Sequence, residues 1–173
     1  LKMAELFPKV LKNFDLYING DSLGREVESI KLPSTATKYE TLETGVFSRP
    51  VDIPVGFENS MELEIATKGI NFDLLVPEGC GLASTTLQFK GFVEDPGTCD
   101  KISFHANFTG RFGTETDSLK KGEVTGGTVT FKAVTAEYIV NGTSIYEERV
   151  LENVLIVNGK DLKAEENAAL GRM

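Results

Sequence analysis

The sequence contains no tryptophan, one histidine, two cysteines and six prolines among its 173 residues. With a single imidazole and no Cys-x-x-Cys pair, it lacks the ligand spacing of a structural zinc site. Two cysteines are too few for a disulfide framework in a chain of this length, so we expect Cys80 and Cys99 to be reduced. No apolar run approaches the roughly 20 residues of a membrane-spanning helix, so we predict no membrane anchor.

Motifs for phosphate binding and nucleophilic catalysis are also absent from the sequence. Neither a Gly-x-x-x-x-Gly-Lys-Ser/Thr loop nor a Gly-x-Ser-x-Gly turn occurs. Glu62 and Glu64 are two residues apart and share one face of a predicted strand, whereas a glycosidase needs carboxylates from different elements across a cleft. We therefore predict a structural or interaction protein without catalytic residues, metal ligands or a cofactor, rather than an enzyme.

The charge balance is acidic, with 26 acidic against 18 basic side chains and a net charge of −8. The acids are uneven: residues 21–100 contain 14 acidic and 6 basic residues, which is −8 by themselves, and the remainder balances. Proteins that bind duplex DNA usually present a basic patch, and the closest run here is Lys120-Lys121. The composition therefore argues against specific nucleic-acid binding.

Hydrophobic periodicity predicts a mainly β fold. Apolar and polar residues alternate in several segments, as expected of strands with one packed face. Asn-Gly pairs, which favour tight hairpin turns, follow three of these segments. We predict a single domain over residues 1–173, a β-sandwich or partly open barrel with one packed short helix. The predicted strands are Phe14–Ile18, Val27–Leu32, Met61–Ile65, Thr85–Phe92, Lys101–Phe112, Thr128–Val140, Ser144–Val150 and Asn153–Val157.

Helix and loop signals are fewer. We predict a short helix over Thr67–Val76, ended by Pro77, and another over Asp161–Leu170, ended by Gly171. An amphipathic turn is expected at Ala4–Asn13, within a flexible or contact-making N-terminal segment of residues 1–12. The long loops Ser34–Pro50 and Gly113–Gly127 exceed the usual length in a compact domain, so we interpret them as contact arms or extended hairpins.

In two segments the alternation places the polar side chains on one face of the predicted sheet. Met61, Leu63 and Ile65 alternate with Glu62 and Glu64. The same alternation in Lys101–Phe112 separates an apolar face from a polar one. The apolar residues there are Ile102, Phe104, Ala106 and Phe108, and the polar ones are Ser103, His105, Asn107 and Thr109. The polar face must meet water, a partner or a channel, and which of these it meets determines the function.

The order and spacing of several short motifs resemble the major tail tube proteins of contractile-tailed bacteriophages and phage-tail-like bacteriocins. The resemblance runs from about Leu11 to Gly171. Its most recognisable block is Gly45–Glu62, a glycine-containing loop, Pro-Val, an alternating strand, and then Gly-hydrophobic-Glu-x-x-Met-Glu. The other matching segments are Leu11–Gly20, Lys31–Pro33, Phe89–Phe92, Thr109–Phe112, Leu119–Glu123, Tyr138–Gly142, Ile145–Glu147 and Val157–Leu162.

This resemblance implies a structural role in the virion tail. Such proteins form hexameric rings in which neighbouring sheets join into a continuous inner barrel, and the rings stack into a hollow tube. The implied partners are the sheath, the tape-measure protein, the baseplate hub initiator and the tail terminator, with assembly in the bacterial host cytoplasm. In a genome-delivering phage the viral DNA passes through the lumen without specific binding, and the sheath drives the tube through the envelope.

On this basis the sequence predicts two groups of assembly residues. The side chains expected to face the lumen are Glu62, Glu64, Ser103, His105, Asn107 and Thr109. Those expected to make contacts between rings are Glu40, Glu43, Phe47, Arg49, Glu115, Asp117, Lys120 and Lys121. Two alternatives remain open at this point: the tube ring protein of a type VI secretion-like system, and a β-sandwich carbohydrate-binding module or glycoside hydrolase.

Overall fold

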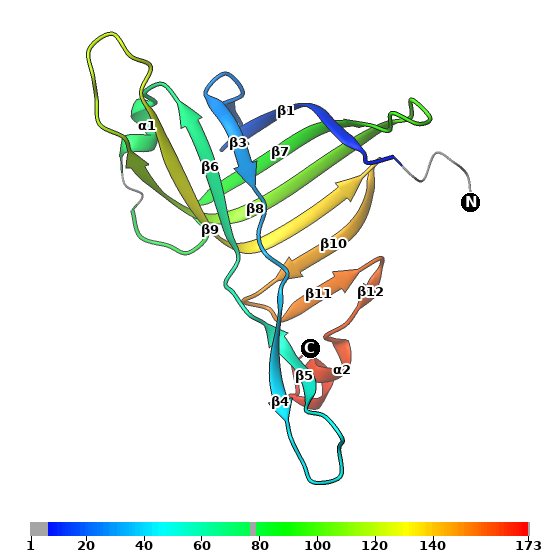
Figure 1. The fold of residues 1–173 in the computed structure, drawn as a ribbon. Coiled ribbons are helices and arrows are strands. Elements are labelled where there is room, and N and C mark those ends of the chain that lie inside the picture. The colour runs from blue at the N-terminus through cyan, green and yellow to red at the C-terminus, as the bar shows by residue number, and fades with distance from the viewer. Residues whose placement is uncertain (1–6, 77–78, 173) are drawn as a thin grey trace.

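The chain is mainly β, as the computed structural model shows for residues 7–76 and 79–172, the part of the chain that it describes (Figure 1). These residues form twelve strands and two short helices. In chain order they are β1 (Val10–Ile18), β2 (Asp21–Ser22), β3 (Val27–Lys31), β4 (Thr37–Leu42), β5 (Val51–Phe57), β6 (Glu62–Lys68), α1 (Phe72–Leu75), β7 (Thr85–Glu94), β8 (Lys101–Thr116), β9 (Gly126–Val140), β10 (Thr143–Arg149), β11 (Val154–Val157), β12 (Lys160–Asp161) and α2 (Ala164–Ala169).

Ten strands form one antiparallel sheet around the long hairpin of β8 and β9. One edge of β9 pairs with β8, and its other edge is divided between β6 and β10. Along the main path of the sheet, the strand order is β12-β11-β10-β9-β8-β7-β1-β2. A branch leaves this path at β9 through β6, and β3 pairs with β6. Strands β4 and β5 pair only with each other, as a separate two-stranded sheet among the described strands.

The main sheet bends strongly, so that β3 and β6 lie across the core from β1 and β7 (Figure 1). The predicted alternation is confirmed at the core: Leu63 and Ile65 of β6 are fully buried, and so are Ala106 and Phe108 of β8. A row of aromatic rings continues this core toward β10. Its neighbouring ring centroids are 5.2–5.8 Å apart, through Phe14, Phe89, Phe104, Tyr138 and Tyr146.

A bulge in the β8–β9 ladder marks the point where β9 changes its outer neighbour. The register shifts between Thr109 and Gly110, and Val134 of β9 is skipped. On one side of the bulge Ala133 N donates to Met61 O, and on the other Val150 N donates to Val134 O. A Cβ atom at Gly110 would lie 2.0 Å from Lys132 O, so the close approach of the two backbones requires glycine.

Two of the three Asn-Gly turns are fastened to a neighbouring strand by the asparagine side chain. Asn19 and Asn141 both have φ 50°, the left-handed conformation that asparagine tolerates. Asn141 N donates to Ser103 O, and Asn141 Oδ1 accepts from Ser103 N at 3.0 Å. Asn19 makes the same pair of bonds with Thr86. The side-chain oxygen thus extends the ladder by one bond beyond the strand.

Replacing Asn141 by alanine is expected to lower the free energy of unfolding by about 2 kcal/mol. About half of this is the cost of placing alanine at positive φ, and the rest is the bond to Ser103. Asn158 is the matched control, because it has the same φ and Asn-Gly context but no side-chain hydrogen bond to another described residue. Asn158→Ala should lose only about 1 kcal/mol in urea denaturation, and equal losses would contradict this role of the side chain.

Both predicted helices are shorter than the sequence indicated. Thr67 and Lys68 belong to β6, because they pair with Gly127 and Gly126 of β9, so α1 is confined to Phe72–Leu75. Asp161 belongs to β12, and α2 covers only Ala164–Ala169, ended by Gly171 at φ 69°. Both predicted helices are therefore present, each as a shorter segment than the sequence indicates.

Strand pairing also corrects the predicted N-terminal turn and both predicted loops. Residues 10–13 lie in β1, paired with β7, and residues 1–6 lie outside the described chain. β4 occupies part of Ser34–Pro50 and pairs with β5, which leaves residues 43–50 as the connecting loop. β8 continues to Thr116 and β9 begins at Gly126, so the second loop spans only residues 117–125. Pairing with distant strands extends these strands beyond the residues in which apolar and polar side chains alternate.

Candidate assembly surfaces

The six residues predicted to face a lumen share the outer face of the main sheet, opposite the core. On β8, Ser103, His105, Asn107 and Thr109 alternate with the core-facing side chains. Glu62 on β6 faces outward beside Lys132 of β9, and Lys132 is directly opposite Arg111 of β8. β6 and β8 thus carry all six side chains, and β9, which pairs with both strands, joins them into one continuous face.

The charge on the outer face is mixed rather than acidic. Glu62 forms an ion pair with Lys132 on the neighbouring strand. Glu64 is directly opposite Lys31 of β3 on one side and Thr130 on the other. His105 lies between Lys90 and Ile139, and the Lys90 ammonium lies 4.7 Å from the centre of the Tyr17 ring. The two glutamates therefore have basic neighbours that the sequence did not reveal.

The hairpin of β4 and β5, with residues 43–50 between them, extends away from the main sheet (Figure 1). We call residues 37–57 the arm. All residues of β5 are exposed. The four large apolar residues of β5, Val51, Ile53, Val55 and Phe57, run along the arm, and we call them the apolar stripe. A bulge leaves Val55 unpaired between Pro54 and Gly56, so Val51 and Ile53 lie on one face of the arm and Phe57 on the other. Each of these four is 41–52% exposed.

An apolar patch lies at the opposite end of the molecule from the arm, around α1 and the loop of residues 117–125 (Figure 1). Gly69 N donates to Thr125 O, and Thr114 Oγ1 donates to Leu74 O, which holds α1 beside this loop. We call this surface the distal patch. Phe72 and Val124 are its most exposed side chains, at 75% each. The other exposed apolar members are Ile70, Leu75, Val76, Leu82 and Leu119.

The sequence of the chain matches the model of a known protein family. Residues 8–171 match the model of phage tail tube protein FII. The chain belongs to the phage tail tube protein FII family. A search of curated proteins found no match.

Membership of this family assigns the chain a structural role as a component of a phage tail tube. Among residues 7–76 and 79–172, no group of three His, Cys, Asp or Glu side chains could hold a metal ion. No helix in the same part of the chain is long and apolar enough to span a membrane. Cys80 and Cys99 are free and exposed.

For a tail tube protein, the residues predicted to contact neighbouring rings are placed at two ends. Glu40 lies on β4, and Glu43, Phe47 and Arg49 lie in the loop of the arm. The other four lie beside the distal patch, with Glu115 on β8 and Asp117, Lys120 and Lys121 in the loop of residues 117–125. The tertiary structure thus separates the eight residues into two groups, and in a single subunit the groups do not meet (Figure 1).

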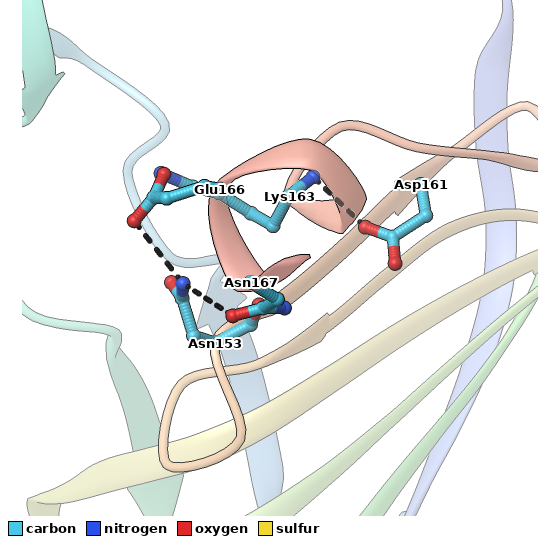
Figure 2. Close-up of polar contacts among 5 residues, drawn as sticks. All are labelled: Asn153, Asp161, Lys163, Glu166 and Asn167. Atoms are coloured by element: carbon cyan, nitrogen blue, oxygen red, sulfur yellow. Dashed lines mark hydrogen bonds and ion pairs between the residues drawn. The ribbon is translucent and has the colours of Figure 1, made fainter. Parts of the chain in front are cut away.

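The C-terminal segment of the tail tube protein is fastened to the turn before β11, near the base of the arm (Figure 2). Asn153, at φ 53°, donates from Nδ2 to Glu166 Oε1 at 3.1 Å and to Asn167 Oδ1 at 3.0 Å. Asn167 Nδ2 donates in return to Asn153 O. Lys163 Nζ donates to Glu166 Oε2 at 2.7 Å, and this bond and the one from Asn153 hold the pKa of Glu166 below its usual value.

Two apolar surfaces escaped sequence reasoning, although signals for both are present. Val51–Phe57 alternates apolar and other residues in sequence, and the sequence predicts one strand continuous with Met61–Ile65, whereas β5 and β6 belong to different sheets. The distal patch has no periodic signal, because its members come from α1, from the residues on either side of α1, and from the loop of residues 117–125. Its apolar residues become a surface only when β8 and β9 bring these segments together.

Proposed function

We propose that copies of this chain form hexameric rings that stack head to tail into the inner tube of a contractile phage tail. The arm is the observation that carries this proposal. A two-stranded hairpin is at best marginally stable in water by itself, and this one exposes its apolar stripe along its whole length. The arm therefore requires a partner surface, and the family to which the chain belongs supplies one in neighbouring copies of the same chain.

The positions of the arm and the distal patch favour head-to-tail stacking. They are different surfaces at opposite ends of the molecule, so a contact between them is heterologous (Figure 1). Repetition of a heterologous contact that does not close produces an open filament, which is the geometry of a tube. In this arrangement the end of one subunit that carries the arm faces the distal patch of a subunit in the next ring, and both apolar surfaces leave water.

Ring closure is proposed to use the edges of the main sheet. β12 and β2 end the strand path, and β3 ends the branch through β6. Edge strands expose unpaired N–H and C=O groups, and proteins pair or protect them. Pairing of edges between neighbouring subunits would join the sheets into the continuous inner barrel that the resemblance implies.

The outer face of the sheet is proposed to line the lumen. The charge of this face is mixed. Glu62 is paired with Lys132, and Arg111 is the next residue along the same row. Because Glu62 lies beside Lys132 and Glu64 lies opposite Lys31, acidic side chains offset part of the basic charge, which favours passage of DNA over tight binding of its phosphates.

The remaining parts of this proposal concern the other tail components. In a contractile tail the tube lies inside a sheath, contains the tape-measure protein during assembly, begins on the baseplate hub initiator and ends at the tail terminator. Assembly of these components would take place in the host cytoplasm. Genome delivery and membrane puncture are then functions of the whole tail, to which this chain contributes the conduit.

Electron cryomicroscopy of the purified full-length chain, alone and with the isolated baseplate hub, tests the proposal. We expect hollow tubes with six subunits per ring, the arm placed between rings, and His105 and Asn107 facing the channel. A monomeric protein under both conditions would contradict the tube. A tube with Glu62 and Glu64 directed toward the outside would contradict the assignment of the lumen face while leaving the tube intact.

A further inference from the structure

A cavity of about 360 Å³ lies between the base of the arm and strands β9 and β10. Its wall is largely apolar and aromatic, with Phe57 at the end of β5, Met61, and the rings of Tyr138 and Tyr146. A second cleft, of about 570 Å³, opens on the other side of the arm base toward β11 and α2. Phe57, Glu148 and Val150 line both cavities, so Glu148 lies where the two meet.

Among the described residues, Glu148 is the only acidic one that lines the first cavity, and none that lines it is basic. Tyr146 and Glu148 point to the same side of β10, because they are two residues apart. Tyr146 OH donates to Glu148 Oε2 at 2.5 Å, which leaves the other carboxylate oxygen available. Tyr138 stacks on Tyr146 with ring centroids 5.2 Å apart, so a carboxylate lies beside a stack of two tyrosine rings.

The charge of Glu148 is not neutralised by the nearest basic side chains of its own chain. Arg149, on the opposite face of β10, forms ion pairs with Glu147 and Glu152. Lys163 is paired with Glu166. The pKa of Tyr146 is raised by burial and by its bond to the charged Glu148, and that of Tyr138 by burial and by the same charge. Glu148 is half-buried and has no cationic partner among the described residues, so a cation that entered the cavity would form a favourable ion pair with it.

A carboxylate beside aromatic faces suits a guanidinium group in particular. Guanidinium is planar, stacks on aromatic rings, and presents paired N–H donors to a carboxylate. An ammonium group lacks the planar stacking surface and the fork of donors. We propose that this cavity, which we call the Glu148 pocket, binds the arginine side chain of a second copy of the chain, and that this arginine is Arg49. This deepens the proposed function, since it rests on contacts between copies.

Arg49 is chosen because of its position and its lack of partners. It lies in the loop of the arm, and it forms no hydrogen bond or ion pair with another described residue. The strand from Val51 to Phe57 separates it from the Glu148 pocket of its own chain by about 20 Å, which no side chain spans. Arg49 can therefore reach only the pocket of another copy. Charge complementarity and the outward extension of the arm both favour this pairing (Figure 1).

The binding chemistry can be tested on unassembled full-length protein with N-acetyl-arginine amide as the probe, followed by ¹H–¹⁵N chemical shifts. We expect saturable shifts centred on Tyr138, Tyr146 and Glu148. Glu148→Gln should weaken binding about tenfold or more, because it removes a charged hydrogen-bond partner. Glu147→Gln is the matched control: it removes the same charge from the opposite face of β10, and its affinity should equal that of the unmodified chain.

Three outcomes of the binding test would overturn the pocket. They are no saturable shift, shifts elsewhere on the surface, or equal weakening by Glu148→Gln and Glu147→Gln. N-acetyl-lysine amide is the second probe, and an affinity equal to that of the arginine probe would overturn the choice of guanidinium. Tyr146→Phe removes the hydroxyl but keeps the ring, and it should retain binding of the arginine probe. Retained binding in this variant would show that a substitution in the pocket does not by itself unfold the protein.

Assembly provides the test of Arg49 as the occupant. Arg49→Glu and Glu148→Arg should each reduce tube formation in electron micrographs, and the double variant with both changes should restore it. Failure of the double variant to recover, or normal tubes from both single variants, would overturn the pairing. If the unmodified chain formed no tubes while the arginine probe still bound, the proposed function would fail and the Glu148 pocket would stand.

Discussion

Tubes will not form when Val55 is replaced by aspartate, although each subunit will fold. Val55 lies in the apolar stripe of the arm and is 52% exposed in the single subunit. An exposed position tolerates a charged side chain, so the free energy of unfolding should change by less than about 0.5 kcal/mol. In the proposed stack the same side chain is buried against a neighbouring ring, where an unpaired charge costs several kcal/mol at every repeat of the contact.

Leu151→Asp is the matched control for this arm variant. Leu151 lies in the turn between β10 and β11, is 68% exposed, and belongs to neither the arm nor the distal patch. Negative-stain micrographs should therefore show tubes for Leu151→Asp and isolated subunits for Val55→Asp. Circular dichroism should show folded β structure for both variants. Normal tubes from Val55→Asp would exclude the apolar stripe as a contact between subunits.

Replacing Gly110 by alanine is expected to destabilise the subunit by at least about 3 kcal/mol. The new Cβ atom would lie 2.0 Å from Lys132 O and 2.7 Å from Ala133 Cα. Both atoms belong to the backbone of β9, so a side-chain movement cannot relieve the clash. The two strands must separate at the bulge, where β9 exchanges β6 for β10 as its outer neighbour and where the bend of the sheet is set.

The same strand offers a control for this effect. At Gly113, three residues further along β8, a Cβ atom would meet nothing within 4 Å. Gly113→Ala should therefore change the free energy of unfolding by no more than about 0.5 kcal/mol in urea denaturation. Similar losses for the two variants would show that the intrinsic preferences of alanine and glycine in a strand, and not the close approach at Gly110, determine the cost.

Local sequence sufficed wherever one face of a strand is packed on the core. In Lys101–Phe112 and Met61–Ile65 the period of two identified the buried side chains, because β geometry directs alternate residues to opposite faces. The Asn-Gly turns were equally local, since asparagine and glycine accept positive φ at little cost. The order of short motifs indicated the tail tube family, and the family-model match over residues 8–171 confirmed it.

Local sequence patterns did not determine where the strands end or how long the helices are. β8 continues through Gly113–Thr116 and β6 through Thr67 and Lys68 because each pairs with β9. Gly113, Glu115 and Lys68 have weak strand preferences of their own, and the hydrogen bonds that fix these segments come from distant parts of the chain. The same long-range pairing placed Lys132 beside Glu62, which changed an apparently acidic face into one of mixed charge.

The sequence by itself determined which side chains of each strand share a face, where the tight turns lie and which family the chain belongs to. Only the tertiary structure decided which apolar faces are covered. Val51–Phe57 and Met61–Ile65 alternate alike in sequence. The apolar face of β6 is buried because pairing with β9 in the bent sheet places it in the core opposite β1 and β7, whereas β5 pairs with β4 alone in a separate sheet and stays exposed. Alternation is a property of the backbone, whereas burial depends on what the rest of the chain places opposite.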